Sequence, residues 1–289
     1  MKPQSEKAHA FAALHERADA FVMAAPWDLG SARMAAGQGF EALELTPRTL
    51  SISYGMRGGA LDVTADMLLD AARAISAGTD LPLTVDLGDT VPDAPEDVAS
   101  LVTAIIDAGA VGVTLSDTTK SDALWPILSD TAARQRIAAA RDAADAFDIP
   151  VTLTARTEIV SSGEGEADEA ATRLRRLQSV GADVLDIPGL HAIEELEMVR
   201  KETLRPLSLP LRKGGPQPMD KMKVSALAKA GVKRISADDS MVLLAYGAVL
   251  NAGQSVLDRG AIGATLPAEM KYATVLAAMQ AGRERVKEQ

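Results

Sequence analysis

Two aspartates and one arginine could form an active site, because each follows a short apolar run. Asp86 and Asp89 close the segment LPLTVDLGD (81–89), and Arg156 closes PVTLTAR (150–156). Mg²⁺ binds through one or two carboxylates together with waters and substrate oxygens. Arginine clamps a carboxylate or a phosphonate through two parallel hydrogen bonds. These residue types predict a site that holds a small anionic carboxylate substrate beside Mg²⁺, with Asp86 and Asp89 as metal ligands.

Two other interpretations stay open for these residues. In one, Arg156 forms an ion pair with Asp86 or Glu158 that only holds the mouth of the site together. In the other, the protein is a metal-free aldolase, for which Lys213 is the one lysine that we consider as a Schiff-base former. Lys213 follows an arginine and precedes two glycines (RKGG, 212–215), a pattern that could bind a phosphate but is more typical of a mobile lid or a plain loop.

Eight apolar runs must position these side chains, and a helical pattern follows each of them. The runs are residues 21–26, 42–46, 81–89, 112–117, 150–157, 184–188, 206–211 and 234–237. Strands that alternate with helices predict a parallel sheet, and eight such units close it into a (β/α)8 TIM barrel. The predicted fold class is therefore α/β, with a single barrel domain over residues 1–289. An open doubly wound sheet is the alternative, and residues 239–289 add C-terminal helices.

Active sites of such barrels lie at the C-terminal ends of the strands, so polar residues at these ends are candidates. Besides those already named, they are Trp27, Asp28, Thr46, Ser116, Asp117, Thr157, Ser236 and Asp238. Asp28 is equally suited to cap the following helix. We expect Asp117 and Asp238 to be solvated loop acids. We expect residues 47–63 to be a loop, because polar residues and glycines punctuate them.

Composition and charge exclude several function classes. The chain has a formal net charge of −10 and no basic run, so nucleic acid and an anionic membrane surface are poor partners. It has no cysteine, which excludes disulfides, thiolate metal sites and a cysteine nucleophile. There is no run of roughly 18 apolar residues and no apolar signal-peptide core at the N-terminus, so we expect a cytoplasmic protein.

Segments along most of the chain make it resemble the isocitrate lyase and phosphoenolpyruvate mutase superfamily, over roughly residues 10–250. The main ones are PWDLGSA (26–32), LPLTVDLGD (81–89), AGAVGVTLSD (108–117), TARTE (154–158), GADVLDIPGL (181–190) and AGVKRIS (230–236). The resemblance implies a magnesium-dependent lyase, hydrolase or mutase of small 2-oxo acids. Such enzymes pass through an enolate that the metal and backbone amides stabilise. It also implies a homo-oligomer, a dimer or a tetramer, with the helices of residues 239–289 exchanged between subunits.

The resemblance also assigns roles by position. Asp86 matches the principal metal-site aspartate of the superfamily, and Arg156 matches the arginine that binds the substrate carboxylate. Trp27 and Asp28 match the motif after strand one, and Ser236 matches the serine of strand eight.

Several positions depart from the superfamily pattern at the metal site. The second acid, two residues after Asp86, is replaced by Gly88. The Glu-Asp pair at the end of strand four is replaced by Ser116 and Asp117, and the aspartate of the loop after strand two by Gly58-Gly59. The catalytic cysteine of the lyase branch is absent. The chain therefore resembles a divergent member that lacks several acids of the metal site.

The segment after strand two has gained a positive charge. Thr46-Pro47-Arg48 stands where the superfamily has small residues whose backbone N–H groups face the substrate, and proline has no N–H. Acids have been lost and Arg48 has been added. We therefore expect an anionic ligand to bind with weak or no Mg²⁺, with Arg48 and Arg156 supplying the positive charge.

The resulting prediction is a divergent carbon–carbon lyase or hydrolase that acts on a small 2-oxo or dicarboxylic acid through an enolate. The predicted catalytic residues are Asp86, Arg156 and Arg48. The predicted substrate-binding residues are Trp27, Asp28, Thr46, Ser116, Glu158 and Ser236. The alternative is a non-catalytic or metal-independent relative that keeps the barrel and binds ligands. The residues at positions 58, 88 and 116 favour that alternative.

Overall fold

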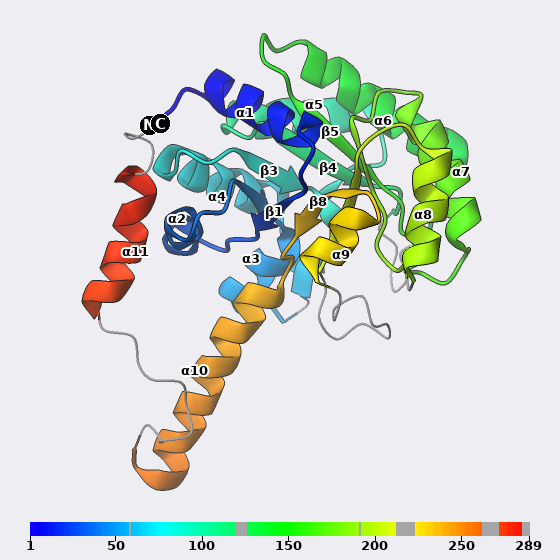
Figure 1. The fold of residues 1–289 in the computed structure, drawn as a ribbon. Coiled ribbons are helices and arrows are strands. Elements are labelled where there is room, and N and C mark those ends of the chain that lie inside the picture. Colours follow the sequence, from blue (N-terminus) through cyan, green and yellow to red (C-terminus); the bar gives the residue numbers. More distant parts are fainter. Residues whose placement is uncertain (58, 120–125, 191, 212–222, 262–271, 285–289) are drawn as a thin grey trace.

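Eight parallel strands form a closed barrel in chain order, and β8 pairs with β1 (Figure 1). The computed structural model describes residues 1–57, 59–119, 126–190, 192–211, 223–261 and 272–284, without the side chains of Asp89, Tyr272 and residues 281–284. The strands are β1 Phe21–Ala24, β2 Ala42–Leu45, β3 Leu83–Asp86, β4 Gly112–Ser116, β5 Thr152–Arg156, β6 Val184–Asp186, β7 Leu207–Pro210 and β8 Val232–Ser236. The predicted (β/α)8 barrel is confirmed, and the alternative of an open doubly wound sheet is wrong.

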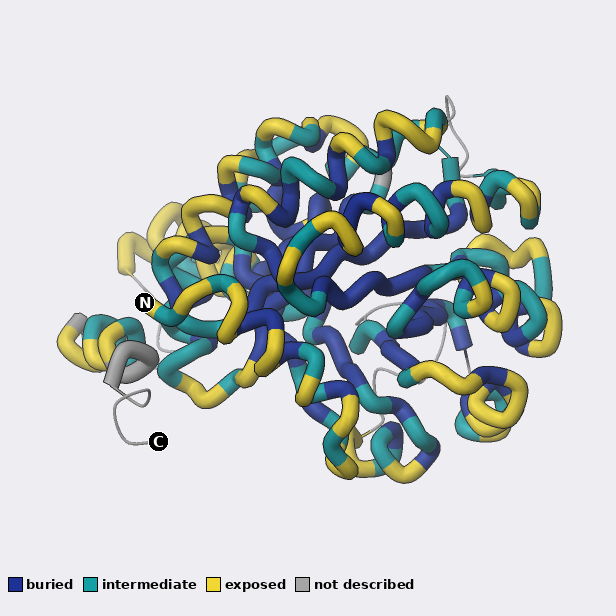
Figure 2. The backbone as a smooth tube through the Cα atoms, turned by 90° about the horizontal axis from the view of Figure 1, so that it is seen from above, coloured by how far each residue is buried: buried dark blue, intermediate teal, exposed yellow. Residues whose placement is uncertain are grey.

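Helices surround the barrel, and all but α10 lie close to its outer surface or its end (Figures 1 and 2). They are α1 Gln4–Glu16, α2 Leu29–Gln38, α3 Pro47–Ser53, α4 Ala65–Gly78, α5 Pro95–Asp107, α6 Asp130–Asp145, α7 Ala167–Gln178, α8 Ile193–Glu202, α9 Val224–Lys229, α10 Ser240–Arg259 and α11 Tyr272–Glu284. Two 3-10 turns, η1 Gly59–Asp62 and η2 Gly88–Thr90, follow β2 and β3. The hydrophobic core lies between the strands and the helices, where residues such as Leu43, Leu45 and Val85 are fully buried.

The expected loop over residues 47–63 is wrong in its first half, where helix α3 lies. The hydroxyl of Thr46 accepts a hydrogen bond from the backbone N–H of Thr49 at 3.2 Å and so caps this helix. Pro47 occupies the first helical position, where its missing N–H leaves no bond unmade. Helix α3 therefore presents Pro47 and Arg48 at the C-terminal end of the barrel.

The interior of the barrel is polar. Side chains alternate along a strand, and the inward ones form hydrogen bonds between strands that are not neighbours. Arg156 on β5 reaches Asp86 on β3, and Arg234 on β8 reaches Thr154 on β5 at 2.9 Å. Barrels of this class usually fill their interior with Val, Ile and Leu. The charged interior beneath the strand ends therefore departs from this usual filling.

The two C-terminal helices differ in how they pack. Helix α10, drawn in orange, projects away from the barrel, whereas α11, drawn in red, lies against α2 (Figure 1). A Cβ atom on Gly37 would lie 1.9 Å from the carbonyl oxygen of Ala278. The glycine therefore allows α2 and α11 to touch at their backbones.

Candidate active site

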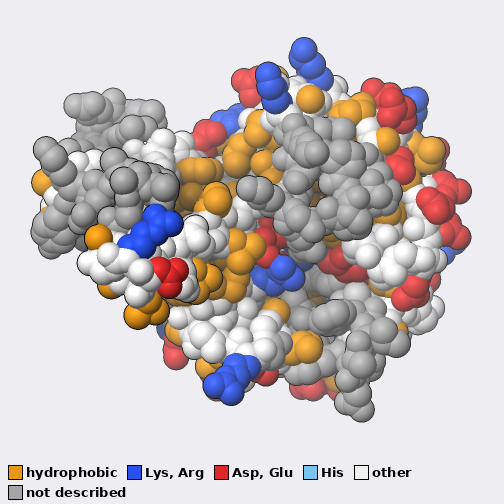
Figure 3. Space-filling model, turned by 90° about the horizontal axis from the view of Figure 1, so that it is seen from below, with side chains coloured by type: hydrophobic (Ala, Val, Ile, Leu, Met, Phe, Trp, Pro, Cys, Tyr) orange, Lys and Arg blue, Asp and Glu red, His pale blue; other side chains and the backbone are white. Residues whose placement is uncertain are grey.

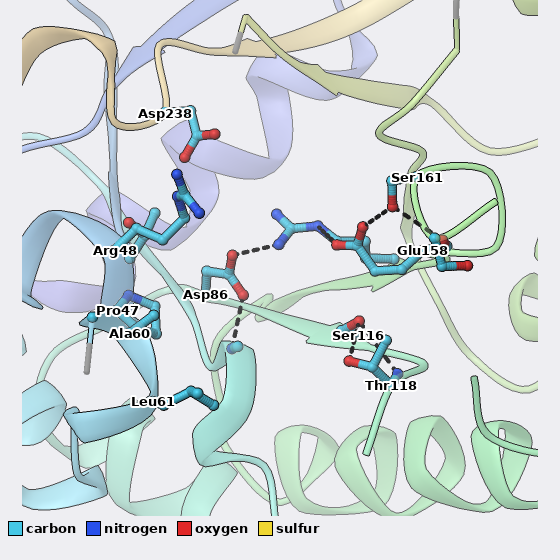
Figure 4. Close-up of a pocket in the computed structure, with 15 residues that line it drawn as sticks. Pro47, Arg48, Ala60, Leu61, Asp86, Ser116, Thr118, Glu158, Ser161 and Asp238 are labelled. Atoms are coloured by element: carbon cyan, nitrogen blue, oxygen red, sulfur yellow. Dashed lines mark hydrogen bonds and ion pairs between the residues drawn. The ribbon is translucent and has the colours of Figure 1, made fainter. Parts of the chain in front are cut away.

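A cavity of about 500 Å³ opens at the C-terminal ends of the strands. Acidic and basic side chains meet in a hollow on this face of the molecule (Figure 3). The residues that line the cavity are Thr46, Pro47, Arg48, Gly59, Ala60, Leu61, Asp86, Gly88, Ser116, Thr118, Arg156, Glu158, Ser161, Ser162 and Asp238 (Figure 4). Most of them come from β3 to β5, from α3 and η1, and from the turns after β5 and β8.

Arg156 lies at the floor of this cavity between two aspartates. Its Nε donates to Asp186 Oδ2 and its Nη1 donates to Asp86 Oδ2, both at 2.5 Å. Burial alone lowers the pKa of Arg156, but the carboxylates of Asp86 and Asp186 outweigh it and raise that pKa well above its ordinary value. The sequence suggested an ion pair of Arg156 with Asp86 or Glu158; the pair with Asp86 is present, and Glu158 Oε1 also lies 4.0 Å from Arg156 Nε. Nη2 is the guanidinium nitrogen that these two bonds leave for a ligand.

Arg48 lies on the opposite side of the cavity and points toward Asp238 (Figure 4). Its Nε and Nη2 both donate to Asp239 Oδ2, at 2.9 and 2.6 Å. The Asp239 side chain is only 2% exposed, whereas that of Arg48 is 51% exposed. Asp238 is also buried and adopts a φ of 45°, so our expectation of a solvated loop acid is wrong. Arg48 therefore carries positive charge from helix α3 to the rim of the cavity.

Gly88 is fitted against Pro47. The φ of Gly88 is +46°, which favours glycine, and a Cβ atom at this position would lie 2.9 Å from Pro47 Cγ. The backbone N–H of Gly88 donates to Asp86 Oδ1 at 2.9 Å. The residue that replaces the second acid of the superfamily thus has its own packing and hydrogen-bonding role.

The family model described as phosphoenolpyruvate phosphomutase matches residues 11–257 of the sequence. The chain belongs to this phosphomutase family. A similar structure comes from a Burkholderia cenocepacia J2315 protein that is provisionally described as a lyase/mutase. It is 34% identical, with a TM-score of 0.87 over 94% of this chain and 95% of that one.

Two further similar structures hold a small acid. Oxaloacetate acetylhydrolase in complex with its product oxalate is 23% identical, with a TM-score of 0.85 over 97% of this chain and 96% of that one. Phosphonopyruvate hydrolase in complex with oxalate and Mg²⁺ is 22% identical, with a TM-score of 0.82 over 98% of both chains. At these identities the likeness concerns the fold. None of the curated proteins matches the sequence.

The family implies Mg²⁺, but the described residues of this phosphomutase-family member do not fit it. Both carboxylate oxygens of Asp86 already accept hydrogen bonds, Oδ2 from the Arg156 guanidinium and Oδ1 from the backbone N–H of Gly88. The positive charge of Arg156 stands where a cation would approach. Among the described residues, no group of three or more His, Cys, Asp or Glu side chains is placed to hold a metal ion. The side chain of the predicted metal ligand Asp89 lies outside the described part of the structure, and so does all of Lys213. The metal-binding role of Asp89 and the Schiff-base role of Lys213 therefore stay predictions.

The structure brings together most of the residues that the sequence singled out. Thr46, Arg48, Asp86, Ser116, Arg156 and Glu158 all line the cavity, whereas Trp27, Asp28 and Ser236 are not among its lining residues. Asp28 caps α2, since its Oδ1 accepts the N–H of Ser31 at 2.7 Å. The hydroxyl of Ser236 donates to Glu44 and accepts the N–H of Asp238, so its hydrogen bonds are made inside the protein.

Asp117 is a structural anchor and not the solvated acid that we expected. It is 2% exposed and accepts hydrogen bonds from Arg173 Nε at 2.5 Å and from the Thr157 hydroxyl at 2.6 Å. The backbone N–H of Glu158 donates to its other oxygen at 2.9 Å. Asp117 therefore fixes the chain after β5, where Glu158 faces the cavity.

Sequence reasoning missed the serines beyond Glu158. Ser161 and Ser162 line the cavity, and the Ser161 hydroxyl donates to the Glu158 carboxylate. The segment SSGEGEAD (161–168) has the composition of a flexible polar loop, which carries no signal for a position in a site.

Proposed function

We propose that this phosphomutase-family chain cleaves a carbon–carbon bond in a small 2-oxo or dicarboxylic acid, as a lyase or a hydrolase. The observation that carries the proposal is the placement of Arg156 at the floor of the cavity. Asp86 and Asp186 hold its guanidinium rigidly by Nη1 and Nε, and Nη2 remains for a substrate carboxylate. Two proteins of similar fold bind oxalate, which is a small dicarboxylate.

The charges around the cavity suit the enolate that such a cleavage forms. Arginine donors placed before the reaction stabilise a developing negative charge strongly where water is excluded. Arg156 would hold the carboxylate, and Arg48 would face the far end of the substrate. Thr46 and Ser116 line the same cavity, and their hydroxyls are the further candidates for hydrogen bonds to substrate oxygens. Because the described residues do not fit Mg²⁺, we assign the neutralising charge to the two arginines.

A metal-independent ligand-binding protein without turnover is the second candidate. Both arginines of the cavity already pair with buried acids, Arg156 with Asp86 and Arg48 with Asp239. Such pairs offset much of the positive charge of both arginines, which leaves less of it to stabilise a new negative charge in a transition state.

Turnover assays separate the two candidates. Oxaloacetate, phosphonopyruvate and 2,3-dimethylmalate are each supplied with and without Mg²⁺. We expect one of them to be cleaved, and Asp86→Ala to reduce the rate by at least about 100-fold, because Arg156 loses its fixed position. Glu41→Gln, on the surface and paired with Arg17, is the matched carboxyl control and should keep the rate.

Titration calorimetry of the wild type and Asp86→Ala with Mg²⁺ measures whether these proteins bind the metal. We expect weak or no Mg²⁺ binding, equal in the wild type and in Asp86→Ala. Tight binding of Mg²⁺ that depends on Asp86 would contradict the assignment of the charge to arginines. Binding of the acids without any turnover would contradict the proposed lyase or hydrolase activity and would favour the ligand-binding protein.

Helix α10 suggests how this chain associates. Large apolar side chains on it are exposed, namely Leu243, Leu244, Tyr246, Val249, Leu250, Val256 and Leu257. Within the described residues, α10 is the helix that is long and apolar enough to cross a membrane by length and composition alone, and 6% of its apolar window is buried. An apolar surface of this extent usually marks an interface. We propose a homo-oligomer in which α10 packs on a second copy; the cytoplasmic location stays a prediction.

Charge introduced on α10 should disrupt this association. We expect the wild type to sediment as a dimer or larger, and Leu250→Asp combined with Leu257→Asp to sediment as a monomer at micromolar concentration. Buried carboxylates in an apolar interface are strongly unfavourable. Asn251→Asp on the same helix adds a charge without removing an apolar side chain and serves as the control. A monomeric wild type would refute the proposal.

A further inference from the structure

Five charged side chains share the interior of the barrel beneath the cavity. They are Glu44 on β2, Asp86 on β3, Arg156 on β5, Asp186 on β6 and Arg234 on β8. Glu44, Asp86, Asp186 and Arg234 are each at most 5% exposed. Three buried carboxyl groups thus face two guanidinium groups, and the half-buried Glu158 carboxylate, 4.0 Å from Arg156 Nε, adds a further negative charge at the edge of the cluster. With all five groups ionised, this cluster carries one uncompensated negative charge.

Glu44 is the carboxyl group of this cluster that lacks a direct guanidinium partner among the described residues. Asp86 and Asp186 both accept hydrogen bonds from Arg156. Within the described part of the chain, the one hydrogen bond that the Glu44 carboxylate accepts comes from the hydroxyl of Ser236. Arg234 donates to Ser208 and Thr154 at 3.0 and 2.9 Å and does not reach the Glu44 carboxylate.

A buried carboxylate without a direct charged partner is costly, so a proton on Glu44 is favoured. Burial raises the pKa of Glu44 to about 7, against the opposing effects of Arg234 and Arg156 and with a smaller contribution from Asp86. Once Glu44 is protonated, two carboxylates balance two guanidinium groups. Glu44 is therefore the carboxyl group of the cluster that holds a proton most readily.

We propose that Glu44 takes up a proton from solvent when an anionic ligand binds at Arg156. The inference rests on the proposed function in assuming that the ligand is a small acid. A ligand carboxylate at Nη2 of Arg156 adds negative charge to the cluster. It offsets the positive charge of Arg156, which favours the ionised form of Glu44 in the ligand-free protein. The ionised form of Glu44 then becomes less favourable. One proton adds to a Glu44 carboxylate oxygen, and no bond of the ligand is broken.

The charged groups that face Glu44 come from each side of the barrel interior. They are Arg234 on β8, Arg156 on β5 and Asp86 on β3. The uncharged hydroxyl of Ser236, also on β8, donates a hydrogen bond to Glu44. Glu44 does not touch the ligand and acts through the charge of Arg156, so it is a positioning residue. Its signature is a proton count, which a purely structural residue would not change.

Titration calorimetry with oxalate at pH 8, in phosphate and in Tris buffer, measures this count, because the two buffers release different heats on ionisation. We expect the wild type to take up between about half a proton and one proton per oxalate. Its affinity should fall by up to about tenfold per pH unit above pH 7, as linkage requires for one proton. Glu44→Gln keeps the acceptor for Ser236 and should bind oxalate with no proton uptake. Glu41→Gln should behave as the wild type does.

Equal proton uptake in the wild type and in Glu44→Gln, or none in the wild type, would overturn the proposal. If Glu44→Gln does not fold, carboxyl ¹³C NMR titration of the ligand-free wild type provides a second test that does not need the variant. A carboxyl that titrates near pH 7 supports the inference, and titration of all carboxyls below about pH 5 overturns it. Failure of oxalate to bind would refute the proposed function, and the NMR titration would still decide the state of Glu44.

Discussion

Replacing Arg156 by methionine is expected to abolish oxalate binding and to lower the free energy of unfolding by about 3–5 kcal/mol at pH 8. The substitution removes the Nη2 donor from the cavity. It also leaves the carboxylates of Asp86 and Asp186 buried without their guanidinium partner. Urea unfolding and oxalate calorimetry on the same samples measure both effects.

A partly exposed arginine that also makes two short hydrogen bonds to carboxylate oxygens, here both of one glutamate, provides the control. Arg17 donates to both carboxylate oxygens of Glu41, at 2.5 and 2.6 Å, but these side chains are 34% and 47% exposed. Arg17→Met should therefore lower the free energy of unfolding by less than about 1 kcal/mol. The triple change of R156M with D86N and D186N should recover much of the stability without restoring oxalate binding. Equal losses for R156M and R17M would show that burial of the charges is not the cause.

Glu44 should make the stability of the protein depend on pH in an unusual direction. Its folded-state pKa of about 7 lies above the ordinary value of 4.5. The folded chain therefore holds this proton more tightly than the unfolded chain. The contribution to stability is fully present below about pH 4.5 and is lost as the pH rises through about 7.

Glu44→Gln lacks this titration. The free energy of unfolding of the variant, relative to that of the wild type, should thus rise by on the order of 3 kcal/mol between pH 4.5 and pH 8. Urea unfolding of both proteins at the two pH values tests the difference. Glu41→Gln is the reference for surface carboxyls, because Arg17 lowers the pKa of Glu41 instead of raising it. A relative stability of Glu44→Gln that does not change with pH would contradict the buried proton.

The barrel was predictable because its signal repeats eight times along the chain. An error at one boundary, such as β1 ending at Ala24 instead of Pro26, does not alter the count of strands. Helix α3 was missed although Thr46 and Pro47 carry ordinary signals of a helix start. The serines and threonine that follow have modest helix propensity, and tertiary packing decides their structure.

The site was predictable only in part, because topology brings strand ends together but does not choose their partners. Arg48 pairs with Asp239 across 191 positions, and Ser236 meets Glu44 across 192. No local pattern or periodicity connects such pairs. Asp117 was misjudged for the same reason, since its partner Arg173 lies 56 positions further along, on α7.

The contact between Pro47 and Gly88 constrains how this pocket can change during evolution. An acid that arose at position 88 by a single codon change would meet the proline ring and a left-handed backbone at once. Loss of the proline first would remove the N-terminal residue of α3 and bring no new ligand group in return. Each single step is therefore expected to destabilise this part of the cavity wall. The contact therefore makes a gradual change of this chain toward a centre with a second acid at position 88 unfavourable.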